Sequence, residues 1–181
     1  MNQRAPAIIV LTAHDPSWAA RFADEAENVR AALGDVLLEL HHIGSTAIPG
    51  IVAKPVIDML AVVKSVEMFD GSPLCLEALQ YEALGEFGIP GRRYFRKDSA
   101  AGARSHQLHA FAIGSADIER HVGFRDYLCA HPSEAQAYAD LKTMLAKRHA
   151  ADARAYNNGK SEFIREVEQR AATWRRELPG A

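Results

Sequence analysis

The sequence has few cysteines and no long hydrophobic run, and each absence excludes certain classes of protein. Cys75 and Cys129 are the two cysteines among 181 residues. They are too few and too far apart in sequence for a disulfide framework or a Cys-x-x-Cys metal site, and two free thiols suit a reducing compartment. The apolar run Ala7–Leu11 is too short for a secretory or membrane segment. We therefore expect a cytoplasmic protein.

A strong excess of charge of either sign is also absent. The formal net charge is -2, which argues against a broad nucleic-acid-binding surface and leaves room only for a local basic patch. No repeat, low-complexity tract or Pro/Gly/Ser-rich linker divides the chain, whose 48% hydrophobic and 24% charged residues are typical of globular proteins. We expect one domain over residues 1–181, with an α+β core to about residue 115 and packed helices from about residue 116.

The pattern of apolar residues predicts a mixture of strands and helices. Strands are expected at residues 8–11, 36–43, 56–63, 81–84, 93–97 and 107–113. Helices are expected from Asp15-Pro16 to Gly34, from Ser72-Pro73 to Leu79, and over residues 117–130, 133–150 and 160–177. His131-Pro132 and Asn157-Asn158-Gly159 are expected to be breaks between helices.

The most informative segment is a small-residue loop, Gly44–Gly50, between two predicted strands, with Asp58 inside the second strand. Backbone N–H groups in such a turn can bind phosphate oxygens, and a carboxylate opposite them can hold a divalent cation. The same residues also suit an ordinary turn and a strand-bracing aspartate, and the residue types alone leave both interpretations open. A Walker-type phosphate loop is excluded, because no Gly-Lys-Ser/Thr closes this loop.

Two runs, His42–Gly50 and Ala53–Asp58, resemble the signature of the GrpB-like family. Further similar segments follow in the same order: Gly88–Phe95, Leu108–Phe111, Phe124–Leu128 with His131-Pro132, and Tyr156 with Lys160. The resemblance implies the nucleotidyltransferase superfold, an α+β fold with a mixed sheet, flanking helices and a C-terminal helical part. The family also occurs fused to dephospho-CoA kinase in some bacteria, which implies a link to CoA-pathway enzymes.

The resemblance also implies a catalytic metal site, and this sequence departs from it at one position. Proteins of this superfold usually carry an Asp-x-Asp pair on the strand after the Gly-Ser turn, and alternate strand residues share a face. Asp58 occupies the first position of the pair, whereas Leu60 occupies the second. We expect Asp58 and His109 to act as metal ligands and catalytic residues, with Mg²⁺ or Mn²⁺ as the cation. For His109 the alternative is a histidine hydrogen-bonded within the sheet.

Donors for phosphate groups are plentiful. The expected phosphate-binding or nucleotide-binding residues are Gly44, Ser45, Thr46, Lys54, Arg92, Arg93, Arg125 and Lys160. For Lys160 this role is what the resemblance implies. The alternatives are a solvated hairpin edge for Arg92 and Arg93, and a surface pair with Asp126 for Arg125.

These residues predict a nucleotidyltransferase that moves a nucleotidyl group from a nucleoside triphosphate to an unknown small-molecule or protein acceptor. Leu60 favours a different hypothesis, a non-catalytic module that binds nucleotides, anions or a partner and has an incomplete metal site. Metal-assisted phosphate-ester hydrolysis through Asp58 and His109 is a third possibility. The number of carboxylates that meet at the site distinguishes transfer from binding.

Overall fold

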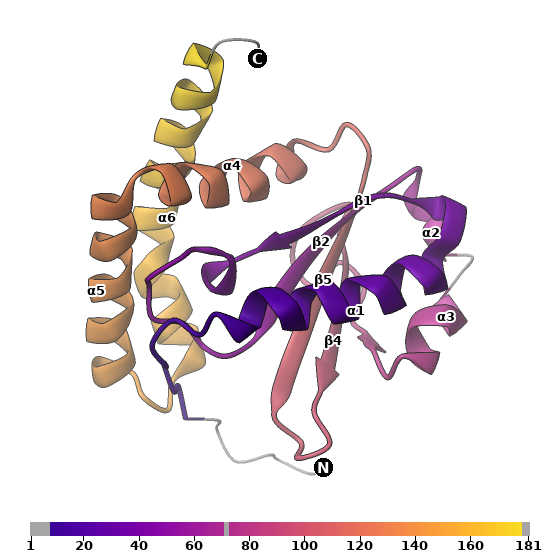
Figure 1. The fold of residues 1–181 in the computed structure, drawn as a ribbon, viewed down its shortest axis with the longest axis horizontal. Coiled ribbons are helices and arrows are strands. Elements are labelled where there is room, and N and C mark those ends of the chain that lie inside the picture. The colour runs from indigo at the N-terminus through magenta and orange to yellow at the C-terminus, as the bar shows by residue number, and fades with distance from the viewer. Residues whose placement is uncertain (1–7, 71–72, 179–181) are drawn as a thin grey trace.

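The computed structural model describes residues 8–70 and 73–178. It contains a five-stranded sheet with helices on both faces (Figure 1). The strands are β1 (Leu37–Ile43), β2 (Ile57–Val63), β3 (Glu82–Ala83), β4 (Arg93–Asp98) and β5 (Arg104–Ala112). The helices are α1 (Ser17–Leu33), α2 (Val66–Asp70), α3 (Pro73–Ala78), α4 (Ala116–Ala130), α5 (Pro132–Arg148) and α6 (Ala153–Glu177). The predicted α+β class is confirmed.

The sheet is mixed, with the strand order β1-β2-β5-β4-β3. Strands β2 and β5 run parallel, and the other neighbouring pairs run antiparallel. In this register Asp58 lies beside Gln107, and Leu60 lies beside His109. Paired residues project from the same face of a sheet, so these four side chains all face α4, α5 and α6.

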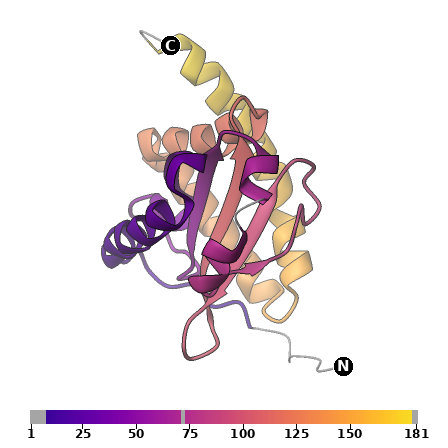
Figure 2. The ribbon, with the colours of Figure 1, turned by 90° about the vertical axis from the view of Figure 1, so that its right-hand side faces the viewer.

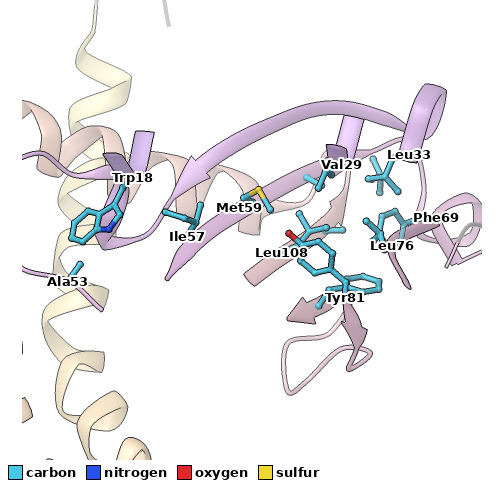
Figure 3. Packing of buried hydrophobic residues seen from close by; sticks show 14 residues of the cluster. Trp18, Val29, Leu33, Ala53, Ile57, Met59, Phe69, Leu76, Tyr81 and Leu108 are labelled. Carbon is cyan, nitrogen blue, oxygen red and sulfur yellow. The ribbon is translucent and has the colours of Figure 1, made fainter. Parts of the chain in front are cut away.

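The opposite face of the sheet carries the main hydrophobic core (Figure 3). The amphipathic helix α1 covers this face and buries Trp18, Val29 and Leu33 against it. Met59 of β2 and Leu108 of β5 complete the packing between the helix and the central strands. In Figure 2, α1 lies to the left of the strands and α6 passes behind them.

A second apolar cluster joins the C-terminal helices to the connection between β1 and β2. Ile48 and Ile51, from the loop after β1, pack with Tyr127, Leu128 and Val167 of the helices.

The face of the sheet that carries Asp58 is apolar at one end and open to a cavity at the other. Leu60 lies in an apolar cluster with Ile43, Val62 and Phe111, whereas the end near Asp58 borders a cavity.

Two secondary-structure predictions are wrong. Residues 8–11 form no strand; Ile9 instead packs against Leu145 and Tyr156 of the C-terminal helices. The expected break at Asn157-Asn158-Gly159 lies inside α6, which begins earlier because the Asp152 side chain accepts a hydrogen bond from the Ala155 N–H and caps the helix. The helix start expected at Ser72 lies outside the described residues. No helix in the described segments is long and apolar enough to cross a membrane.

Candidate functional site: a lysine-lined cavity

A cavity of about 370 Å³ lies between the sheet and the C-terminal helices. Its volume falls within the range of small-molecule sites. Seven of the residues that the sequence predicted line it together: Gly44, Ser45, Thr46, Lys54, Asp58, His109 and Lys160. They come from the β1–β2 connection, two central strands and α6, so only the folded chain brings them together.

Gly44 and Asp58 lie in close contact in the cavity wall. Gly44 has a φ of 70°, and a Cβ built there would lie 2.4 Å from the Asp58 Oδ2. Glycine is therefore required both for the turn and for the close approach of the carboxylate. The Asp58 side chain remains 27% exposed. Burial raises its pKa to about 7, although Lys160 and Lys54 favour the charged form.

Three lysines from different elements converge on the cavity. They are Lys54 before β2, Lys142 of α5 and Lys160 of α6. The ammonium groups of Lys54 and Lys160 lie 4.7 and 4.5 Å from the centroid of the Tyr156 ring. Lys142 is 2% exposed; its Nζ donates a hydrogen bond to the Val52 carbonyl and lies 4.6 Å from the Tyr138 ring centroid.

Burial makes the positive charge on these lysines costly. Burial, with a contribution from Lys160, lowers the pKa of Lys142 to about 7. Burial and the neighbouring Lys54 lower the pKa of Lys160 to about 8, and burial also lowers the pKa of Lys54. Two carboxylates line the cavity, and one of them, Glu168, is already paired with Arg120 at 2.8 Å. The cavity is therefore suited to an anion that carries more than one charge.

His109 lies on the cavity wall as a neutral side chain. Its Nε2 is 4.0 Å from the Asp58 Oδ1, and its Nδ1 is 3.3 Å from the Arg92 Nη1. A guanidinium only donates hydrogen bonds, so Nδ1 accepts and Nε2 carries the proton. Burial, with the nearby His121, Arg92 and Arg120, lowers the pKa of His109 to about 3. This tautomer presents no free nitrogen lone pair to a metal ion.

The remaining residues that the sequence predicted lie outside the cavity lining. Arg92 reaches the site only through His109. Arg93 pairs with Asp70 at 2.5 Å, away from the cavity. Arg125 donates to the His42 carbonyl and pairs with Asp126, which holds α4 against β1.

The sequence analysis missed Lys142 and Tyr138, both on α5, and Arg120 and His121 on α4. Spacing offered one usable signal, because Tyr138 and Lys142 are four residues apart and share a helix face. Nothing in the sequence indicates that this face is buried against the Val52 carbonyl.

Comparisons with known proteins agree with this architecture. UPF0157 protein YqkA of Bacillus subtilis is 42% identical over 163 residues, which are 90% of this chain and 47% of that protein. The chain thus spans about half the length of this relative. The dephospho-CoA kinase of Mycobacterium tuberculosis is 28% identical over 94% of this chain and 47% of the kinase.

One solved structure supports the fold. The crystal structure of the conserved protein GrpB from Enterococcus faecalis has a TM-score of 0.88 and 36% identity, covering 93% of this chain and 100% of that chain. Terminal uridylyl transferase 4 from Trypanosoma brucei, solved with bound CTP, has a TM-score of 0.48 and 14% identity over 84% of this chain and 51% of that chain. That similarity is too weak to support an argument about function. The GrpB protein family matches residues 8–170, and this chain belongs to that family.

Proposed function

We propose that this protein binds the phosphate groups of a nucleotide in the lysine-lined cavity. The convergence of Lys54, Lys142 and Lys160 beside the Gly44–Thr46 turn carries this proposal. A triphosphate supplies negative charge to balance the lysines. Its oxygens accept hydrogen bonds from the ammonium groups and so replace the water molecules that burial removes. The expected link to CoA-pathway enzymes makes dephospho-CoA a further candidate ligand, because it also carries phosphate groups that such a site can bind.

Nucleotidyl transfer with Mg²⁺ or Mn²⁺ is the second candidate function, favoured by the position of Asp58 beside the turn. The residues present do not fit a pair of metal ions. Leu60 is buried in an apolar cluster where the second carboxylate would stand, and the neutral His109 presents an N–H. Among the described residues, no three Asp, Glu, His or Cys side chains gather where they could hold a metal ion. Asp58 can supply one ligand to a cation that arrives with the phosphates.

Calorimetric titration with and without Mg²⁺ or Mn²⁺ tests the two candidates. The ligands are tripolyphosphate, ATP, GTP, CTP, UTP and dephospho-CoA. Lys142→Met removes one ammonium group from the cavity, and Lys147→Met is the matched control, because Lys147 lies on the exposed side of the same helix. We expect metal-free binding that weakens about tenfold or more in Lys142→Met and is unchanged in Lys147→Met.

Asp58→Asn separates the two candidates. Phosphate binding by lysines predicts equal or tighter metal-free binding in this variant, because a competing negative charge is lost. Binding that needs a divalent cation and disappears in Asp58→Asn would instead favour nucleotidyl transfer. If no ligand binds the wild type under any condition, both candidates are wrong.

The pH dependence of binding gives an independent check. The pKa values of Lys142 and Lys160 are about 7 and 8, so the titration should cover pH 6 to 9. Sulfate is a suitable probe, because it stays doubly charged over this whole range. As the pH falls through these values the lysines gain protons, and Asp58, with a pKa of about 7, loses its charge. We expect the affinity to rise as the pH falls, by up to about tenfold per pH unit for each proton taken up on binding. An affinity that is flat over this range would contradict the assignment of the lysines.

A further inference from the structure

A surface loop between β3 and β4 carries an aromatic side chain in an unusual backbone conformation. Phe87, in the connection between β3 and β4, is 63% exposed and has a φ of 44°. A positive φ is common for glycine and tolerated by asparagine, but it is strained for a bulky residue. The folded chain therefore holds a large apolar ring at the surface in a backbone conformation that does not favour it.

Buried hydrogen bonds hold this loop in place. The Arg92 side chain, itself buried, donates from Nη2 to the Phe87 carbonyl at 2.7 Å and from Nε to the Glu86 carbonyl at 3.1 Å. Its Nη1 contacts the Nδ1 of His109 on the cavity wall. One guanidinium thus fixes the position of Phe87 relative to the cavity, which explains why Arg92 is buried although it does not line the site.

A series of ring contacts runs from the cavity to Phe87. The ring of Tyr94 lies 5.1 Å from His109 and 5.2 Å from Phe87, and the Phe87 pair is stacked with an interplanar angle of 27°. The Tyr94 hydroxyl donates to Gln107, another residue of the cavity wall, at 2.5 Å. Phe87 ends this series, and because it is largely exposed it can accept one more ring.

We propose that Phe87 is the stacking platform for the base of the nucleotide whose phosphates bind among the lysines. This inference rests on the proposed function and deepens it, since it selects nucleotides over free polyphosphates. Stacking on an aromatic face tolerates every base, so Phe87 would favour nucleotides as a class and leave discrimination among bases to other contacts. The strain at Phe87 is then maintained because a ring is needed at this position.

The test compares ATP with tripolyphosphate in the wild type and in Phe87→Asn. Asparagine tolerates a positive φ, so this variant removes the ring without adding backbone strain. We expect ATP binding to weaken about tenfold or more, and tripolyphosphate binding to stay unchanged. Phe87→Trp should retain ATP binding, and its fluorescence should change on addition of ATP but not of tripolyphosphate. Ile113→Asn is the matched control, because Ile113 is also 63% exposed but takes no part in the ring contacts that lead from His109 to Phe87.

The outcomes separate the inference from the proposed function. If tripolyphosphate binds and Phe87→Asn leaves the affinity for ATP unchanged, the stacking role is wrong and the phosphate site stands. If the variant weakens both ligands equally, Phe87 only maintains the cavity and the stacking role is again wrong. If neither ligand binds the wild type, the proposed function fails and the inference falls with it.

Discussion

At the scale of single residues, Gly44 and Asp58 define the site through a contact that has no room for a side chain. The carboxylate occupies the space of the missing Cβ, so any other residue at position 44 must displace Asp58 or open the turn. Gly50 offers a matched comparison in the same loop. It has a φ of 78°, and nothing lies within 4 Å of a Cβ built there.

Gly44→Ala should therefore cost more stability than Gly50→Ala. Both variants place alanine in a left-handed conformation, at about 1–2 kcal/mol each. Only Gly44→Ala also pushes against Asp58, and we expect it to lower the free energy of unfolding by at least about 1 kcal/mol more. Urea unfolding of both variants measures the difference. Equal losses would mean that Asp58 moves aside freely.

Individual residues also show which parts of the site the sequence could predict and which it could not. Gly44 and Asp58 were predicted because the turn and the strand are local patterns, whereas Lys160 was predicted from the resemblance to the GrpB-like family. Lys142 was not, because in the sequence it resembles any other lysine on an amphipathic helix, and its burial depends on the carbonyl of Val52, 90 residues away. Arg93 was expected at the site because of its charge, and the fold instead places it beside Asp70.

At the scale of elements, α6 shows how a local signal can mislead. The segment Asn157-Asn158-Gly159 is a usual helix breaker, but the cap at Asp152 and tertiary packing carry the helix through it. Gly159 is needed there because a Cβ would lie 2.5 Å from the Leu145 Cδ2. The five strands of the sheet and most of the other helices followed from apolar periodicity, which depends on neighbouring residues alone, whereas α2 was not predicted.

Gly159→Ala and Gly123→Ala should have opposite effects on stability. Replacing a mid-helix glycine by alanine normally gains about 0.5–1 kcal/mol. Gly123 on α4 has room for a Cβ, with its nearest neighbour at 3.6 Å, so Gly123→Ala should be stabilising by this amount. At Gly159 the Leu145 side chain is confined by Ile9 and Tyr156, so overpacking should outweigh the gain and cost about 1 kcal/mol net.

Thermal or urea unfolding measures both glycine variants. Tripolyphosphate binding provides a second measurement, because Lys160 follows Gly159 directly and should move with it. A Gly159→Ala variant as stable as Gly123→Ala would show that Leu145 repacks easily and that α5 and α6 are not closely fitted.

At the scale of the whole molecule, the sequence predicts one domain in which the C-terminal helices pack on the α+β core. Two features of the structure bear on this prediction. Residues of the β1–β2 connection pack among the C-terminal helices, and the lysines of the cavity come from both parts of the chain. A bound polyphosphate would contact both parts, so it should stabilise them together.

The two tryptophans allow this to be measured. Trp18 is buried in the main core, and Trp174 contacts Tyr127 and His131 in the C-terminal helices. In Trp174→Phe the fluorescence reports on the core, and in Trp18→Phe it reports on the helices. Within each variant we expect fluorescence and circular dichroism to give the same unfolding midpoint.

Tripolyphosphate at 100 times its Kd should then add about 2.7 kcal/mol to the free energy of unfolding, whichever tryptophan reports it. A lower midpoint for Trp174 than for circular dichroism would mean that the helices unfold separately, and stabilisation confined to Trp18 would exclude Lys142 and Lys160 from the binding site.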